Sequence, residues 1–251
     1  MRVQIFDVNN FVLRDTSHTT HGGLKGRSQV RATFERVQNS VDLHIFVRDG
    51  RGSRARRKAI YPEYKAKRVP KTEDKMAGID LFFEIMKLSK AVTVDCPGWE
   101  ADDVIGTIAQ KLLPDDEIVI HTNDSDFGQL ASSRVSIPRM KQCAPAEYVP
   151  LYKALVGDST DNIPGCKGFG PGAWEAAQPY WADIKAAFDA KDASLLPVTF
   201  RLGRNFDFDR LLDFYTITKM FDVPQAELTA GMVPGSNQPD VAARVLQEYF
   251  L

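Results

Sequence analysis

The sequence has few of the residues that build disulfide frameworks, zinc sites or membrane spans. Its three cysteines, Cys96, Cys143 and Cys166, lie far apart and form no CxxC motif, so we expect neither a disulfide framework nor a thiolate zinc site. None of the four histidines has a partner at HExxH spacing, and we expect them to lie on the surface or in loops. No apolar run is long enough to span a bilayer, and residues 1–10 carry an aspartate where a signal peptide needs an apolar core. We therefore expect a soluble protein of the reducing cytoplasm.

The sequence also lacks a large net charge and the common loops of hydrolases. Its 32 basic and 33 acidic residues leave a net charge of −1, so any basic surface that binds nucleic acid must be local. Neither a GxxxxGK[ST] phosphate loop nor a GxSxG elbow is present, which argues against nucleotide-driven activity and serine-based hydrolysis.

Short apolar runs alternate with helical patterns in the first half of the chain. Alternation of this kind is typical of a mainly parallel sheet with helices on its faces, and 251 residues with 43% hydrophobic content suffice to bury a core. The predicted strands are 3–6, 43–47, 91–94 and 117–122, and the predicted helices are 28–38, 79–88 and 101–113. The fold class is therefore predicted to be α/β.

The second half of the chain has helical patterns instead of strands. They are joined by a loop at 163–172 that is rich in Gly and Pro. We predict two parts, an α/β core at 1–147 and a helical region at 148–251. Within the second part, residues 231–239 have the composition of a loose linker.

A basic run connects the second and third predicted strands. Between Arg51 and Lys75, ten basic residues stand against three acids, so the local charge is +7. Such a run can be a solvated, mobile connection. It can also bind a nucleic acid strand, an interpretation that Tyr61 and Tyr64 favour because stacking on bases needs aromatic rings among the cations.

Acidic residues follow three of the predicted strands. Asp7 comes directly after 3–6, Asp49 lies two residues after 43–47, and Asp124 and Asp126 follow 117–122. Because parallel strands end at the same edge of a sheet, we expect these carboxylates to share one pocket.

Three more acids, Glu100, Asp102 and Asp103, open a predicted helix. Each acid alone can be a helix cap or a turn residue. Several carboxylates in one pocket repel one another, so such a cluster persists where cations neutralise it. Oxygen ligands without His or Cys favour Mg²⁺ or Mn²⁺ over zinc.

Five motifs, in this order, resemble those of the 5′-nuclease (flap endonuclease) superfamily. The resemblance runs from about residue 3 to about 225 and is greatest to stand-alone bacterial and phage 5′-3′ exonucleases, with similarity to the N-terminal nuclease domain of bacterial repair polymerases. The motifs are FD at 6–7, YPEYKAKR at 61–68, WEADDVIGTIA at 99–109, TNDSDFGQL at 122–130 and LVGDSTDNIPGCKGFGPGA at 155–173.

The resemblance implies a resolvase-like or PIN-like core with a basic arch at about 51–90, and a helix-hairpin-helix of the H3TH type in the helical region. The implied metal ligands are Asp7, Asp49, Glu100, Asp102, Asp103, Asp124, Asp126, Asp158 and Asp161. The implied catalytic residues are Lys65 and Arg68, and the implied DNA contacts are Arg14, Tyr64, Lys67, Gly165, Lys167, Gly168 and Gly170. Two Mg²⁺ or Mn²⁺ ions would serve the acids, with K⁺ at the hairpin.

The implied activity is that of a structure-specific 5′-3′ exonuclease or flap endonuclease that hydrolyses DNA by a two-metal-ion mechanism. Its substrates would be 5′ ends, flaps and single-strand to double-strand junctions in replication or repair, in a bacterium or phage-infected cell. We expect a monomer with no membrane contact and with a replication or repair polymerase as partner. The alternatives are a PIN-type ribonuclease or RNase H-like enzyme and a non-catalytic DNA-binding protein.

Three positions depart from the resemblance. Asn123 and Ser125 stand where relatives usually have Gly and Lys, and Gly172 stands where a lysine commonly supports duplex binding. Because no acid is missing, the departures predict weaker binding of duplex DNA without loss of activity.

Overall fold

The structure is a computed structural model that describes residues 1–16, 24–197 and 207–248. It divides into two compact units. The sheet unit comprises Met1–Ser53, Pro70–Met140 and Phe221–Leu251, and the helical unit comprises Arg54–Val69 and Lys141–Met220. This division differs from the expected boundary at 147/148, because the chain enters the helical unit twice and its last segment belongs to the sheet unit. The predicted arch is divided between the two units.

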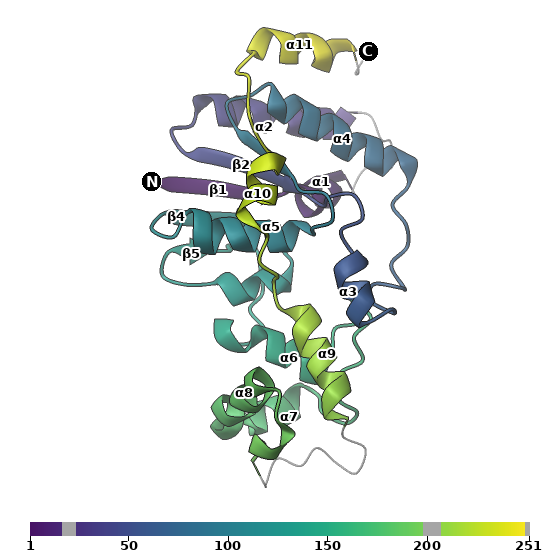
Figure 1. Cartoon of the computed structure of the whole chain (residues 1–251). Coiled ribbons are helices and arrows are strands. Elements are labelled where there is room, and N and C mark those ends of the chain that lie inside the picture. The colour runs from purple at the N-terminus through teal and green to yellow at the C-terminus, as the bar shows by residue number, and fades with distance from the viewer. Residues whose placement is uncertain (17–23, 198–206, 249–251) are drawn as a thin grey trace. The chain divides into compact units, whose positions relative to one another are not determined.

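A six-stranded sheet forms the centre of the sheet unit (Figure 1). The strand order is β5-β4-β1-β2-β3-β6, with β6 antiparallel to β3 and all other pairs parallel. The strands are β1 (Arg2–Asp7), β2 (Leu43–Arg48), β3 (Val92–Asp95), β4 (Glu117–His121), β5 (Val135–Ser136) and β6 (Met232–Pro234). The four predicted strands are confirmed, and β5 and β6 are additional.

Helices cover both faces of this sheet (Figure 1). One face carries α1 (Val8–Thr16), α2 (Leu24–Asn39) and α4 (Glu73–Lys87). The other face carries α5 (Ala101–Thr107), which continues as a π-helical turn over Ile108–Leu112. Because both faces are covered, the strands are apolar along most of their length rather than alternating.

The fourth helix shows why the sequence folds onto the sheet. Its buried residues Ile79, Phe82, Phe83 and Met86 recur at the spacing of one helical face, and they pack in one core with apolar side chains of β1 and β2. The helix begins six residues before the predicted start, since the first turn is polar and carries Glu73 and Asp74, acids that suit a helix N-terminus.

The segment expected to be a loose linker, 231–239, is ordered structure, so that prediction is wrong. Within it, β6 pairs with β3, and the amides of Gly235 and Gln238 each donate to a backbone carbonyl 2.7 Å away, those of Ala91 and Leu88. A Cβ atom at Gly235 would lie 2.1 Å from the Ser89 carbonyl oxygen, so glycine here permits close packing rather than flexibility. The segment lies between α10 (Gln225–Gly231) and α11 (Pro239–Glu248).

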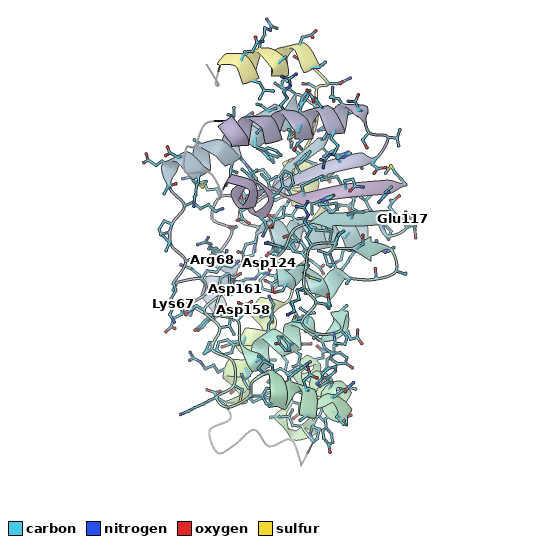
Figure 2. All side chains as sticks on the ribbon, turned by 180° about the vertical axis from the view of Figure 1, so that it is seen from behind. Lys67, Arg68, Glu117, Asp124, Asp158 and Asp161 are labelled. Carbon is cyan, nitrogen blue, oxygen red and sulfur yellow. The ribbon has the colours of Figure 1, made fainter. Side chains whose placement is uncertain are left out.

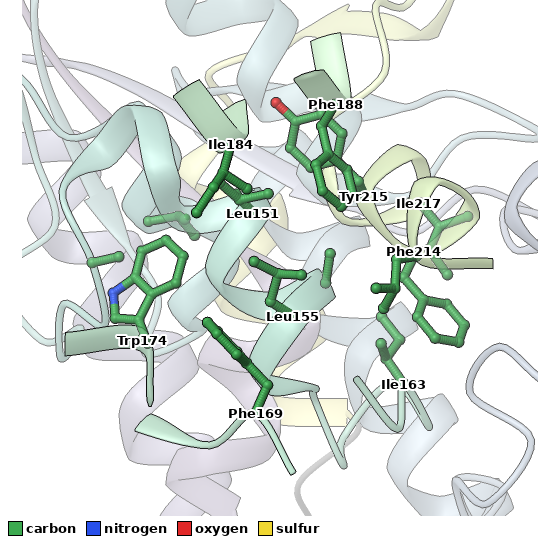
Figure 3. Close-up of a cluster of buried hydrophobic side chains, with 14 of the residues drawn as sticks. Leu151, Leu155, Ile163, Phe169, Trp174, Ile184, Phe188, Phe214, Tyr215 and Ile217 are labelled. Atoms are coloured by element: carbon green, nitrogen blue, oxygen red, sulfur yellow. The ribbon is translucent and has the colours of Figure 1, made fainter. Parts of the chain in front are cut away.

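The helical unit is built around its own hydrophobic core, shown in Figure 3. In α9, Leu211, Phe214, Tyr215 and Thr218 are buried at the spacing of one helical face. The helices of this unit are α3 (Ala55–Ile60), α6 (Val149–Val156), α7 (Pro171–Ala176), α8 (Trp181–Ala190) and α9 (Phe208–Thr218). Short 3₁₀ turns connect several of them.

Part of the basic run is a structural anchor of the helical unit. Arg57 is buried, and its guanidinium donates to the backbone carbonyls of Ile217 and Lys219 at the end of α9, over 2.8 and 3.0 Å. A cation at this position satisfies carbonyls that a helix leaves without partners. The interpretation of the whole run as a solvated connection is therefore wrong for Arg57.

No helix among residues 1–16, 24–197 and 207–248 is long and apolar enough to cross a membrane.

Candidate functional site

The strand order of the sheet unit determines where acids gather. The first three strands follow one another from the centre towards one edge, whereas β4 lies on the other side of β1. The connections therefore diverge between β1 and β4, and ligands of such sheets bind at the carboxyl ends of the strands at this divergence. Asp7 ends β1 and Asp124 follows β4, so both predicted ligands lie at that position. Figure 2 shows Asp124 at the end of β4 opposite Glu117.

Three of the predicted ligands come together as a possible metal site. One carboxylate oxygen from each of Asp102, Asp124 and Asp126 lies within 4.8 Å of the others. Asp102 is in the first turn of α5, while Asp124 caps the 3₁₀ helix Ser125–Leu130 by accepting from the Asp126 amide over 3.0 Å. Asp124 thus caps a helix and also belongs to the acidic cluster. Three hard oxygen donors of this kind suit Mg²⁺ or Mn²⁺.

Asp7 is buried beside this cluster. Its carboxylate accepts from the Asn10 amide over 3.2 Å and from the Thr122 hydroxyl over 3.3 Å. Burial, then the charges of Asp49 and Asp124, raise the pKa of Asp7 to about 7. The electrostatic influence of both acids places them near Asp7 and makes a cation here favourable.

Three asparagines hold these acids or the loops that carry them, and the sequence did not predict their role. Asn9 donates to the Asp49 carboxylate, whose other oxygen accepts from the Ala101 amide over 3.0 Å. The Asn10 and Asn123 side chains link the β1–α1 turn to the loop after β4. The side-chain NH₂ group of Asn10 donates to the side-chain carbonyl of Asn123 over 2.6 Å. The side-chain carbonyl of Asn10 accepts from the Asn123 backbone amide over 3.3 Å. The only signal in the sequence was their position beside the acids.

The two remaining predicted ligands in the sheet unit, Glu100 and Asp103, are buried. Asp103 accepts from the backbone amide of Phe221 over 2.8 Å and so attaches the C-terminal segment to α5. The structure gives Asp103 this structural contact, and ligation by Glu100 and Asp103 stays a prediction.

Asp158 and Asp161 belong to the helical unit, where each pairs with cations of that unit. Lys153 is buried and lies 2.9 Å from Asp158. Burial raises the pKa of Asp158, but Lys153 and the Thr160 amide outweigh it and hold the pKa below its ordinary value. Asp161 contacts Arg68 over 2.9 Å and Lys65 over 3.8 Å. Their ligation of metal stays a prediction.

The predicted DNA contacts differ in exposure. Tyr64 is only 2% exposed and packs in the core of the helical unit, and its contact with DNA stays a prediction. Lys67 is exposed, as a phosphate contact requires. Arg14 lies on α1, and its side chain is outside the described part of the chain.

The loop between α6 and α7 contains the glycines predicted to form a hairpin. Gly165 has φ +70°, and a Cβ there would lie 2.6 Å from the Gly157 nitrogen. Gly168 has φ +83° with open space around it, and Gly170 caps α7. Lys167 is exposed. Glycine is thus needed at 165 for packing and at 168 for its backbone angle; DNA contact by this loop stays a prediction.

Comparison with known families and proteins places these observations in context. Residues 13–153 match the family described as 5′-3′ exonuclease, N-terminal resolvase-like domain. The chain is 32% identical over 157 residues to a 5′-3′ exonuclease of Aquifex aeolicus, which covers 57% of this chain and 54% of that protein. It is 30% identical over 206 residues to the thermostable DNA polymerase I of Thermus aquaticus, covering 74% of this chain and 24% of the polymerase. The chain thus spans about half of the former relative and a quarter of the latter.

Solved structures share the fold. The T5 5′-exonuclease with bound zinc ions superimposes with a TM-score of 0.66 at 19% identity, covering 99% of both chains. The catalytic core of Rad2 in complex with DNA substrate gives a TM-score of 0.58 at 13% identity, covering all of this chain and 87% of that chain. At these identities the likeness is one of fold.

Proposed function

This chain belongs to the family of 5′-3′ exonucleases with an N-terminal resolvase-like domain, and from that membership we propose that it hydrolyses DNA phosphodiesters near 5′ ends. The substrates of the proposal are 5′ ends, flaps and junctions of single-stranded with double-stranded DNA. Relatives named as 5′-3′ exonucleases support the reaction, and DNA bound to the catalytic core of Rad2, which shares the fold, supports the substrate class.

The gathering of Asp102, Asp124 and Asp126 within 4.8 Å of one another carries the proposal. Their three carboxylates, with Asp7 buried nearby and its pKa raised to about 7 by burial, Asp49 and Asp124, form a donor set suited to divalent cations. Divalent cations held by these acids would activate water for attack on phosphorus and would neutralise charge on the leaving oxygen. Mg²⁺ or Mn²⁺ is the proposed cofactor, because every donor is a hard oxygen.

The carboxylates of this site act by position. Asp7 and Asp49 are fixed by Asn10, Thr122, Asn9 and the Ala101 amide. Fixed ligands hold their charge where the reaction needs it without rearranging during catalysis.

Lys65 and Arg68 are the proposed contacts to the scissile phosphate. Both lie in the helical unit, where their cationic groups contact the same carboxylate, that of Asp161. Paired cations bind the oxygen atoms of a phosphate in a similar way. In the proposal they stabilise the negative charge on the oxygen atoms of the phosphate as the bond breaks. Asp158 and Asp161 remain proposed ligands of the second cation, and K⁺ at the hairpin loop remains a proposal as well.

Cleavage assays on defined substrates test the proposed function. End-labelled flap, nicked and blunt DNA, with matched RNA flaps, are incubated with and without Mg²⁺ or Mn²⁺, and product lengths are read. We expect short products from the 5′ side of DNA only with the cation present. Asp124→Asn should abolish them. Glu117→Gln should not, because Glu117 lies at the opposite end of β4.

Each alternative has its own outcome in that assay. Faster cleavage of RNA than of DNA would favour a PIN-type or RNase H-like enzyme. Binding of flap DNA without cleavage under any cation would favour a DNA-binding protein that has no catalytic activity.

A further inference from the structure

We propose that Asp161 is an internal competitor of the DNA phosphate: it occupies Arg68 and Lys65 in the free protein, and binding of DNA exchanges this carboxylate for a phosphate. This inference rests on the proposed function for the identity of the competing anion, a DNA phosphate. The ion pairs that the phosphate would replace lie within the helical unit.

The geometry around Asp161 is that of an occupied anion site. Arg68 contacts one carboxylate oxygen over 2.9 Å, and the Lys65 ammonium lies 3.8 Å from the other; Figure 2 shows Arg68 beside Asp161. Paired cations bind a phosphate in the same way, each contacting a different oxygen of the anion. The three side chains together carry a net charge of +1, so the site keeps positive charge that attracts a DNA phosphate, which like the carboxylate is a monoanion within the chain.

The backbone holds the carboxylate in this position. The Lys65 amide donates to the Asp161 carbonyl over 3.0 Å. The Asn162 side chain also donates to the Glu63 carbonyl over 2.9 Å. The basic segment and the loop that carries Asp161 are therefore joined independently of the ion pairs, so an exchange of anions need not separate them.

Lys65 itself has an unusual backbone conformation. Its φ of +53° is in the left-handed region, which costs a non-glycine residue free energy and persists only where the surroundings impose it. The side chain is 5% exposed, whereas that of Arg68 is 35% exposed. Exchange therefore starts at Arg68, which solvent and an incoming phosphate can reach.

The neighbouring pair of Asp158 with Lys153 provides a contrast in the same loop. Its lysine side chain is 5% exposed and its acid 14% exposed, and they lie 2.9 Å apart. One cation faces one anion, so this pair has no surplus charge for a phosphate. Asp158 is therefore the matched control for Asp161.

DNA binding without divalent cations tests the exchange, because no cleavage interferes. The affinity for 5′-phosphorylated flap DNA is measured by fluorescence anisotropy in EDTA over a series of KCl concentrations. Asp161→Asn removes the competitor, so we expect about five- to tenfold tighter binding and a salt slope steeper by about one. Asp158→Asn removes an equal charge and should tighten binding by less than about twofold.

A double-mutant cycle shows whether the gain in DNA affinity depends on Arg68. In an Arg68→Ala background, Asp161→Asn should no longer tighten binding. A gain that persists without Arg68, an equal gain for Asp158→Asn, or no gain for Asp161→Asn would each overturn the proposal. Thermal melts of every variant establish that it is folded.

The wild-type protein offers a second measurement should Asp161→Asn fail to fold. The guanidinium NMR signal of Arg68, assigned by its loss in Arg68→Lys, should shift when DNA is added in EDTA, while that of the buried Arg57 should not. An unmoved Arg68 signal in the DNA complex contradicts the exchange. If the protein binds DNA with this exchange but cleaves nothing with Mg²⁺ or Mn²⁺, the proposed function fails and the exchange stands.

Discussion

Among the predicted metal ligands, those of the two units have different kinds of partner. In the sheet unit, the hydrogen bonds to Asp7, Asp49 and Asp124 come from neutral amides and a hydroxyl. In the helical unit, Asp158 and Asp161 each face lysine or arginine. The helical unit thus pairs Asp158 and Asp161 with its own cations, whereas neutral donors hold Asp7, Asp49 and Asp124 of the sheet unit where a cation from solution can bind.

The pKa directions follow the same division. Burial first, then Asp49 and Asp124, raise the pKa of Asp7 to about 7. For Asp189, burial also acts upward, but hydrogen bonds from Lys185, Lys219 and Tyr215 lower the pKa to about 2. The folded protein therefore disfavours ionisation of Asp7 and favours ionisation of Asp189.

Outside the metal-binding acids, the largest effect on cleavage should come from removing a cation of the helical unit. Lys65→Ala should lower single-turnover cleavage about 10²- to 10³-fold in saturating Mg²⁺, the loss typical of a preorganised electrostatic group. DNA affinity, measured by anisotropy, should change far less. Lys58→Ala is the matched control, because Lys58 is exposed on α3 of the same basic run. Cleavage at the wild-type rate would refute the assignment of Lys65.

The raised pKa of Asp7 should make the stability of the protein depend on pH. Because its folded pKa of about 7 exceeds the ordinary 3.8, its contribution to stability is complete below about pH 4 and is lost as pH rises through 7. In EDTA, the unfolding free energy of the wild type should fall over this range relative to Asp7→Asn, by at most about 4 kcal/mol. The measurement is denaturant unfolding at pH 4.5 to 7.5.

The helical unit does not obscure that measurement. The folded pKa of Asp189, about 2, lies below its ordinary value, so its contribution is present above 3.8 and is lost only as pH falls through 2. Parallel pH curves for the wild type and Asp7→Asn would contradict the raised pKa of Asp7.

A smaller effect is expected at the loop between α6 and α7. Gly168 has φ +83°, so Gly168→Val strains the loop and should weaken duplex binding about tenfold. Single-turnover cleavage at saturating DNA should change less, since the acids of the sheet unit are untouched. Gly172→Val is the control, because a Cβ there meets open space and the backbone is helical. Equal losses in both variants would remove the special role of Gly168.

The smallest effect concerns the asparagine pair. Asn10→Ala and Asn123→Ala should each weaken Mn²⁺ binding a few-fold, and the double variant should be no weaker than the worse single variant, because both remove one linkage. Calorimetric titration of the four proteins measures this. Fully additive losses would mean that the two residues act independently.

Much of the sheet unit was predictable because its signals are local. Four apolar runs predicted four strands, and the acid after β1 and those after β4 lie where parallel strands end. The short strand β6 was not predictable, because its three residues, ending in Pro234, gain their structure from pairing with β3, about 140 positions away.

The roles of several basic and aromatic residues also depend on distant contacts. Arg57 donates to Ile217, 160 positions away, and Tyr64 is buried by the core of the helical unit. Composition identified the basic run but could not divide its cations into anchors and exposed contacts. Likewise, the motif around Asp161 gave no sign that Arg68 pairs with it.

Calorimetric titration of the metal-free protein with Mn²⁺, in the absence of DNA, measures whether the acids of the sheet unit bind a divalent cation. At pH 7.5 we expect saturable binding that Asp124→Asn weakens at least tenfold and Glu117→Gln leaves unchanged. Absence of binding to the wild type, or equal binding to all three proteins, would contradict the claim that the acids of the sheet unit gather to hold a divalent cation.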